Sequence, residues 1–272
     1  STQSGSSGNY YYDVYDKVGS DSTREVQFAA TYGHYDGSGS LSTSDGNNPS
    51  KAVYRQFRNL CIKNAGSTTK FEFPADNSTV FKDIYVISVN RARYREKIDP
   101  GNWELRLGST NNQVKLIDDS GATADSSIKA SERTFNVVSG SIANGVSDIK
   151  TTAAAESTSD GSYGLFYPEL GLIVLNATRL DVAPLRIGTS ETADSNQNNA
   201  YKIVSASIEG SHFKARREEQ IKSSHYFCRI RSDEYNWSQN PTYYDSTNNA
   251  ELTNTTFVQD PKSYITTVGL YN

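Results

Sequence analysis

The amino-acid sequence predicts a mainly β protein, and two features of its composition carry that prediction. Ser, Thr and Asn contribute 36, 23 and 22 of the 272 residues, about 30 % together. Hydrophobic residues reach 35 %, and Tyr alone contributes 18 residues. Small polar residues suit turns and Tyr suits half-buried sheet faces. We therefore expect many short strands, in a sandwich or in mixed sheets, joined by long polar loops.

The third observation is a single clear helix, expected at about residues 50–62. Ser50 is a good N-cap and follows Pro49. Apolar residues recur at helical spacing, so the helix should lie on the sheet through Val53, Tyr54, Phe57 and Leu60. The opposite face carries Lys51, Arg55 and Arg58.

The strands are expected from alternation and from β-branched runs. In the first half they fall at residues 10–15, 26–32, 84–89 and 103–107, and Trp103 should lie on the core face. The charged stretch 91–97 connects two of them, with one helical turn at most. Asp99-Pro100-Gly101-Asn102 is typical of a tight turn, since Pro sets φ and Gly accepts a positive φ.

The second half is more polar. Short strands are expected at 114–117 and 133–138, and a hairpin at 163–167 and 172–175. A polar loop should span 189–199, with further strands at 203–208, 224–231 and 263–270. Residues 1–9 should form a flexible lead. Residues 10–272 would then be a single β-rich domain, or two closely packed β subdomains with a boundary in 109–160.

The ends of the chain favour a fragment of a longer polypeptide. The chain has no Met, begins with Ser1 and stops at Asn272 inside a strand-like pattern. The alternative is a chance lack of Met together with removal of the initiator.

Composition also excludes several classes of protein. No run approaches about 18 apolar residues, the length of a membrane-spanning helix. Two Cys cannot staple a chain of this length. The net charge of −4 lacks the basic excess of nucleic-acid binders. We expect neither membrane insertion nor a nucleic-acid partner.

Catalytic and metal-binding motifs are weak, so we expect no enzyme, cofactor or metal site. The histidines are His34, His212 and His225, and no Gly-x-Ser-x-Gly elbow accompanies them. A zinc site could be assembled only from His212, His225, Cys228 and Cys61, without a paired Cys motif. The loops at 36–38, 45–47 and 118–120 carry calcium-type ligands, but turn-forming Asp is the favoured interpretation.

Two basic groups stand out and are the candidate interface. Because the chain is acidic overall, salt bridges within the fold or to a neighbouring subunit are favoured over nucleic-acid binding. The residues are Arg91, Arg93, Arg95, Lys214, Arg216 and Arg217.

An ordered set of segments resembles a known family. The segments lie at residues 31–40, 50–60, 84–87, 91–94, 99–105, 163–168 and 260–272. Their order resembles a virion structural protein of large contractile-tailed phages of marine bacteria, including cyanophages. The resemblance runs from about residue 10 to the end. It implies a particle component, in the tail or baseplate, and brings no catalytic residues.

The expected function is therefore structural. The protein would act in the virion through contacts with other virion proteins and copies of itself. Polar loops and a small core suit a subunit held by many neighbours, and Tyr and Arg are enriched at interfaces. The alternative is a receptor- or carbohydrate-binding β module on a virion or cell surface, because exposed Tyr can stack on sugar rings. A glycan-degrading enzyme is the remaining class, which would need two carboxylates meeting in space.

Overall fold

The structure is a computed structural model. It describes residues 4–5, 8–42, 48–73, 81–121, 134–143, 146–149, 162–227, 229, 231, 234, 237–238, 240–245, 247, 251–261 and 269. The chain divides into two compact units, Ser1–Gln220 (unit 1) and Ile221–Asn272 (unit 2). The boundary predicted inside 109–160 stays a prediction, since residues 122–133 and 150–161 lie outside the described part.

Unit 1 is built on a curled ten-stranded antiparallel sheet, which confirms the predicted mainly β class. Hydrogen-bonded neighbours follow one another in this order: β12 (Phe213–Glu218), β6 (Lys97–Leu107), β7 (Val114–Asp118), β8 (Phe135–Ala143), β10 (Gly164–Tyr167), β11 (Leu172–Asn176), β5 (Asp83–Val89), β4 (Val26–His34) and β3 (Tyr11–Tyr15). β9 (Val146–Ile149) pairs with β8 off this path. The expected hairpin is β10 with β11, and the expected helical turn is α2 (Arg91–Tyr94).

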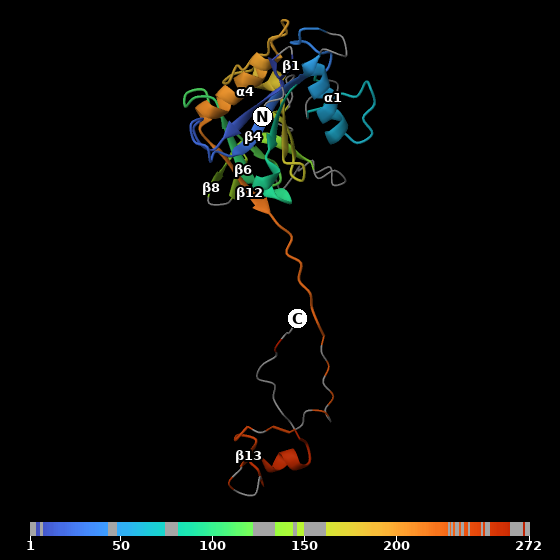
Figure 1. The fold of residues 1–272 in the computed structure, drawn as a ribbon, viewed down its shortest axis with the longest axis vertical. Helices are drawn as coiled ribbons and strands as arrows, with labels where there is room; N and C mark the ends of the chain where they lie inside the picture. The colour runs from blue at the N-terminus through green and yellow to red at the C-terminus, as the bar shows by residue number, and fades with distance from the viewer. Residues whose placement is uncertain are drawn as a thin grey trace. The chain divides into compact units, whose positions relative to one another are not determined.

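Both faces of the sheet are covered, and β5 shows why. Its side chains alternate between two clusters: Tyr85 and Ile87 belong to one, and Ile84 and Val86 to the other. The first cluster includes Ala200 and Ile203 of α4 (Asn196–Gly210), and the second includes α1 (Pro49–Cys61). The two helices therefore cover opposite faces (Figure 1). A strand buried on both sides becomes a continuous apolar run, as at 84–89.

The sheet curls around α4. This helix contacts both β4 and β6, although these strands stand near opposite ends of the strand order. The rings of Phe28 in β4 and Phe213 in β12 lie 5.2 Å apart and nearly perpendicular. The curl thus brings edge strand β12 close to β4. Trp103, Leu105 and Leu107 point into this concave core and are buried, as the alternation in β6 predicts.

α1 forms where it was expected, but its buried face is rotated. The cap is Asn48, whose Oδ1 accepts the Lys51 N–H at 3.0 Å, and not Ser50. Tyr54 is buried, whereas Leu60 is 52 % exposed, so its prediction as a core residue was wrong. Arg58, placed on the solvent face by sequence, is buried and donates to the Ser67 carbonyl at 3.0 Å. The buried stripe follows Tyr54, Arg58 and Cys61, one residue later than the apolar pattern suggests.

Tyr54 ties α1 to the chain that follows it. The Phe81 N–H donates to the Phe71 carbonyl at 3.2 Å, which forms half of an isolated β-bridge. In the other half, the Phe71 N–H donates to the Tyr54 hydroxyl, which donates to the Phe81 carbonyl, each at 2.9 Å. The hydroxyl therefore stands in for a direct backbone hydrogen bond.

The expected turn at 99–102 is a β-bulge inside β6, so that prediction was wrong. Ile98 pairs with Arg217 and Trp103 with Ala215, which sets the four β6 residues 99–102 against one residue of β12, Arg216. Gly101 has φ of 80°, as the turn chemistry predicts, and its N–H donates to both oxygens of Asp118. The same residues serve a bulge because Pro is tolerated where ladder bonding is interrupted.

The strand predicted at 203–208 is also wrong, because these residues belong to α4. The buried stripe of α4 begins with Asn196 and Asn199 and continues through Ala200 and Ile203. Asn199 is buried and makes two hydrogen bonds to Ser190. Its Oδ1 accepts the Ser190 N–H at 2.9 Å, and its Nδ2 donates to the Ser190 carbonyl at 2.7 Å. The polar start hides the helical period, while Ile203, Val204 and Ile208 favour a strand.

Unit 2 is small. β13 (Tyr244–Asp245) pairs with β14 (Glu251–Leu252), and a 3-10 turn, η2 (Thr255–Val258), follows. Tyr243 stacks on Phe257 at 5.2 Å. The described residues 221–227 form no strand, contrary to the prediction at 224–231, and the strand predicted at 263–270 lies outside the described residues apart from Gly269.

The first residues contain one short antiparallel pair, β1 (Ser4–Gly5) with β2 (Gly8–Asn9), and mobility of the 1–9 lead stays a prediction. Among the described residues, no helix has the length and apolar character that crossing a membrane requires.

Candidate functional site

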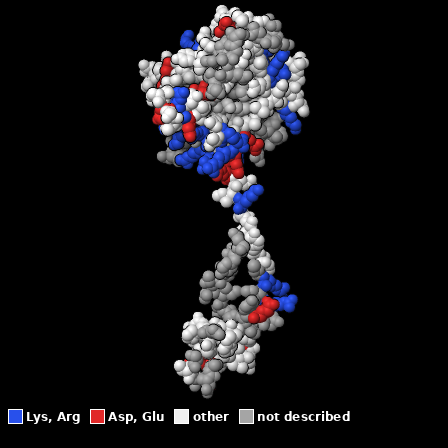
Figure 2. Space-filling model, viewed as in Figure 1, with Lys and Arg blue, Asp and Glu red and all other residues white. Residues whose placement is uncertain are grey.

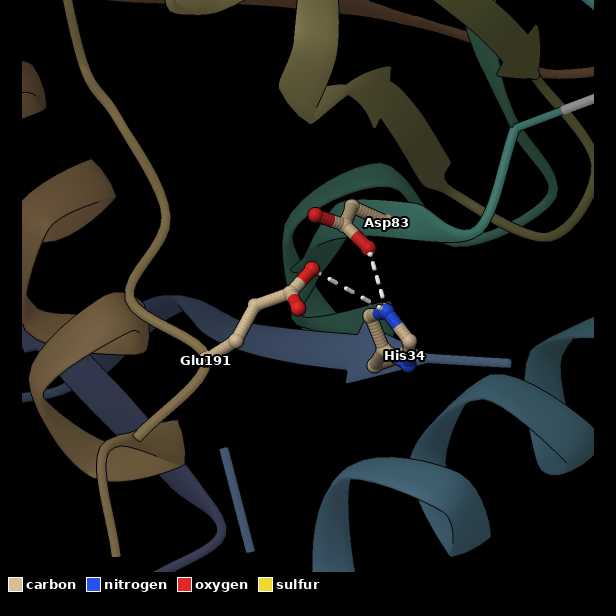
Figure 3. Close-up of side chains that lie close together, drawn as sticks. All are labelled: His34, Asp83 and Glu191. Atoms are coloured by element: carbon tan, nitrogen blue, oxygen red, sulfur yellow. Dashed lines mark ion pairs between the residues drawn. The ribbon is translucent and has the colours of Figure 1, made fainter. Parts of the chain in front are cut away.

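Among the described residues, one group of His, Asp and Glu side chains is close enough to hold a metal ion, and it lies at one end of β4 and β5. His34 ends β4, Asp83 begins β5, and the two are direct cross-strand partners. Glu191 reaches them from the loop before α4 (Figure 3). His34 Nε2 lies 3.0 Å from Asp83 Oδ1 and 3.6 Å from Glu191 Oε1. One ligand-type atom from each residue lies within 4.8 Å of the others, a spacing compatible with a metal ion.

The other ring nitrogen decides what this group can do. His34 Nδ1 accepts the backbone N–H groups of Asp36, Gly37 and Ser38, each at 3.1 Å. An atom that faces three donors carries no proton, so the proton is on Nε2, which lies 3.0 Å from Asp83 Oδ1. Thr189 Oγ1 donates to the other oxygen of Asp83 at 3.0 Å.

This tautomer argues against a metal centre at His34. Metal binding at Nε2 would move the proton to Nδ1, against three N–H groups. A serine-type triad is also mismatched, because there the carboxylate orients Nδ1 and leaves Nε2 for the nucleophile. Here the carboxylate occupies Nε2. The arrangement instead fastens the loop after β4 to the start of β5.

Two tyrosines lie on the core side of the group formed by His34, Asp83 and Glu191. Tyr32 and Tyr85 are cross-strand partners with ring centroids 5.7 Å apart, and both are buried. Burial, and then the charge of Asp83, raise the pKa of both phenols, which therefore stay neutral. The polar contact between His34 and Asp83 is screened little on this side, and the low local dielectric strengthens it. Glu191, 62 % exposed, contributes little.

The other metal candidates are not brought together. Cys61 is buried in the α1 cluster, where burial raises the pKa of its thiol to about 12. His212 lies near Glu104, His225 is exposed, and Cys228 is outside the described residues.

The acidic loops mostly have protein partners instead. Asp118 is bonded to Gly101 and Ser120, Asp119 to Asn136, and Asp36 to Lys82. Asp45 lies outside the described residues.

The six predicted interface residues fall into two groups. Four have partners within unit 1: Arg91 donates to the Glu169 carbonyl at 3.0 Å, Arg93 pairs with Glu25, and Arg95 and Arg217 share Glu219 at 3.3 and 2.9 Å. Whether any of the six contacts a neighbouring chain stays a prediction.

Lys214 and Arg216 form the second group. Both are exposed, and in the described part of the chain neither has an acidic group within ion-pair distance. They line a polar hollow together with Glu104, Arg106 and His212. In Figure 2, Lys and Arg atoms gather at the end of unit 1 where Figure 1 labels β12, and acidic atoms lie beside them.

Glu104 organises the floor of this hollow. It is buried, its Oε1 accepts from Arg106 Nε at 2.7 Å, and its Oε2 accepts the Ile142 N–H at 2.8 Å. Burial acts to raise the pKa of Glu104, but the hydrogen bonds from Ile142 and Arg106 outweigh it and hold the pKa below its usual range. Glu104 is therefore ionised and both of its oxygens have partners.

Sequence reasoning missed both His34–Asp83 and Glu104. A His two positions before Asp36-Gly37-Ser38 is typical of a side chain that caps its own loop, but its partner depends on strand register. The alternation of Glu104 with Trp103 and Leu105 indicates only that it faces away from the core.

No family model, no curated protein and no solved structure matches the chain.

Proposed function

We propose that the protein is a structural component of a phage particle, in the tail or baseplate, and that it acts through contacts with other virion proteins and copies of itself. The ordered segments described above, which resemble a virion structural protein of contractile-tailed phages, support the phage. The exposed apolar side chains after β12 support the contacts.

The observation that carries the proposal is the segment 221–227, which we call the arm. It follows unit 1 without helix or strand, and all seven residues are exposed. Ile221, Tyr226 and Phe227 are 90, 78 and 93 % exposed. Burying one such side chain is worth about 1.5–3 kcal/mol. An arm that carries three of them is expected to be covered by a neighbour.

The surrounding features agree with this role. Among the described residues, the group with the most catalytic types, His34 with Asp83 and Glu191, fastens a loop. Unit 2, which begins with the arm, has a small aromatic cluster of Trp237, Tyr243, Tyr244 and Phe257. A chain of two compact units suits a subunit that contacts more than one neighbour.

The proposal is tested on the phage that encodes the chain. Its purified particles should yield peptides of this chain in mass spectrometry, in stoichiometric amount. Absence of those peptides would refute the proposal.

A variant tests the arm itself. Tyr226→Ser with Phe227→Ser should reduce incorporation of the protein into particles, because the apolar contact is lost. Val18→Ser with Ile208→Ser is the matched control, since these residues are 73 and 61 % exposed on unit 1. Equal incorporation of both double variants would show that the arm is not an assembly contact.

One observation favours the surface-binding alternative. A hollow between α1 and the strands β3 and β4 is lined by Tyr10, Tyr11 and Phe57, types that stack on sugar rings. A glycan array probed with the full chain tests this alternative. Saturable binding that Phe57→Ala abolishes would favour a binding module, and absence of binding would exclude it.

A further inference from the structure

β12 is an open edge of the sheet. It is the last strand in the order and pairs with β6 alone. Its residues from Lys214 to Glu218 are all exposed. The opposite edge strand, β3, is half-buried and contacts α4, where the rings of Tyr12 and Tyr201 lie 5.8 Å apart. The two edges thus differ, and β12 is the accessible one.

The backbone of β12 presents free peptide groups. The Arg106 N–H donates to the His212 carbonyl at 2.9 Å, so even-numbered residues exchange hydrogen bonds with β6. Bonding alternates along an antiparallel pair, hence the N–H and C=O of Phe213 and Ala215 face away from β6. In the part of the chain that the structure describes, no strand pairs there. Such an edge is a template for another strand.

The side chains beside this edge are basic. Lys214 pairs with Glu104 in register, and Arg106 with Lys115, so all four lie on the outer face of the sheet. Arg216 lines the same hollow as Lys214. Arg106, Lys214 and Arg216 therefore line one hollow with a single carboxylate, whose oxygens already accept hydrogen bonds from Arg106 and Ile142, in a chain of net charge −4.

We propose that the β12 edge binds an extended acidic peptide segment of a neighbouring protein chain, which adds as a strand next to Phe213 and Ala215 and places alternate carboxylates against Lys214 and Arg216. The inference rests on the proposed structural function and deepens it by stating the chemistry of one partner. Main-chain hydrogen bonds supply the affinity and the cations select the partner. A nucleic acid offers phosphates, but no peptide groups to match the edge.

The test uses the full chain and a fluorescein-labelled octapeptide of alternating Thr and Glu. Its anisotropy should rise to saturation with added protein and should fall as NaCl is raised, because the contacts are exposed ion pairs. The same peptide with Lys for Glu, and a single-stranded oligo-dT, are the comparison probes and should bind about tenfold more weakly or not at all.

Two variants separate charge from backbone. Lys214→Gln with Arg216→Gln should lower the affinity for the acidic peptide about tenfold. This is the effect expected from losing two exposed ion pairs near the upper end of their range. Lys63→Gln with Arg186→Gln makes the same change in net charge at other exposed sites of unit 1 and should leave binding unchanged. Ala215→Pro removes an edge N–H that β6 does not use and should abolish binding, while circular dichroism stays native.

Three results would overturn the inference. They are no binding of the acidic peptide at about millimolar protein, equal binding of the acidic and basic peptides, and unchanged binding by Ala215→Pro with a native spectrum. The protein could instead bind oligo-dT preferentially and lose that binding in the variant Lys214→Gln with Arg216→Gln. That result would identify the face as a nucleic-acid site. None of these results bears on virion peptides detected by mass spectrometry, so the proposed function is judged separately.

Discussion

Replacing Tyr54 with Phe removes one oxygen atom from the centre of the α1 cluster. The ring is fully buried and contacts the rings of Tyr35 and Phe71 at 5.6 and 5.5 Å, so the variant keeps its packing. Burial raises the pKa of Tyr54, which keeps the hydroxyl as both donor and acceptor. Without it, the Phe71 N–H and the Phe81 carbonyl lose their partners.

The expected loss follows from these two groups. A buried polar group left without a partner costs about 1–3 kcal/mol. For two such groups we expect the free energy of unfolding to fall by about 2–4 kcal/mol. This is less than the full sum, because the two strands can move together and form a direct hydrogen bond that recovers part of the cost. Because the Phe81 N–H already reaches the Phe71 carbonyl at 3.2 Å, some closure is possible and the lower half of the range is expected.

Urea unfolding followed by circular dichroism measures this loss, since the sheet of unit 1 dominates the signal. Tyr35→Phe is the control, because its hydroxyl donates to the Ser67 carbonyl at 3.2 Å in an exposed position. The control should stay within about 0.5 kcal/mol of the parent. A loss for Tyr54→Phe no larger than the control, at unchanged m-value, would refute the inserted-hydroxyl argument.

Three further changes test the core, the His34 tautomer and the Glu104 network. Trp103→Ala should cost about 3–5 kcal/mol in urea unfolding, as for a buried aromatic; a loss below about 1 kcal/mol would place Trp103 at the surface. His34→Gln should cost about 2–4 kcal/mol through the loop N–H groups left without Nδ1, and zinc should not raise the melting temperature of the parent; a zinc-dependent rise would contradict the proton on Nε2. Glu104 has a pKa held below its ordinary 4.5, so it stabilises the fold above that pH and less as the pH falls. The stability difference between the parent and Glu104→Gln should therefore shrink from pH 7 to about pH 3; an increase would reverse the assigned direction.

Much of the fold can be predicted where local pattern and final environment agree. The run 84–89 and the hairpin of β10 and β11 are apolar because both faces are covered, and α1 has a marked start. α4 could not be predicted, because its buried stripe opens with Asn196 and Asn199, whose burial depends on hydrogen bonds across the loop at Ser190. The bulge at 99–102 uses the residues of a tight turn, and only pairing with β12 distinguishes the two.

The candidate sites depend even more on long-range register. His34 and Asp83 meet because β4 and β5 pair in one register, which no local pattern specifies. The basic residues were treated alike in the sequence, yet Arg93 and Arg95 lie in or beside a helical turn and reach acids at 25 and 219. Only Lys214 and Arg216 keep the alternation of a strand, and they are the two without acidic partners in the described chain.

The bulge in β6 has a consequence for how such a sheet can change over time. Ile98 and Trp103 are five residues apart, an odd spacing that would put them on opposite faces of a regular strand, yet both are buried. The extra residues absorb the mismatch, so pairing on either side of the bulge is set independently. One more residue or one fewer at this joint would leave the outer ladder and the core strand in place. We therefore expect related chains to vary in length at 99–102 and to keep the length of 103–107 fixed.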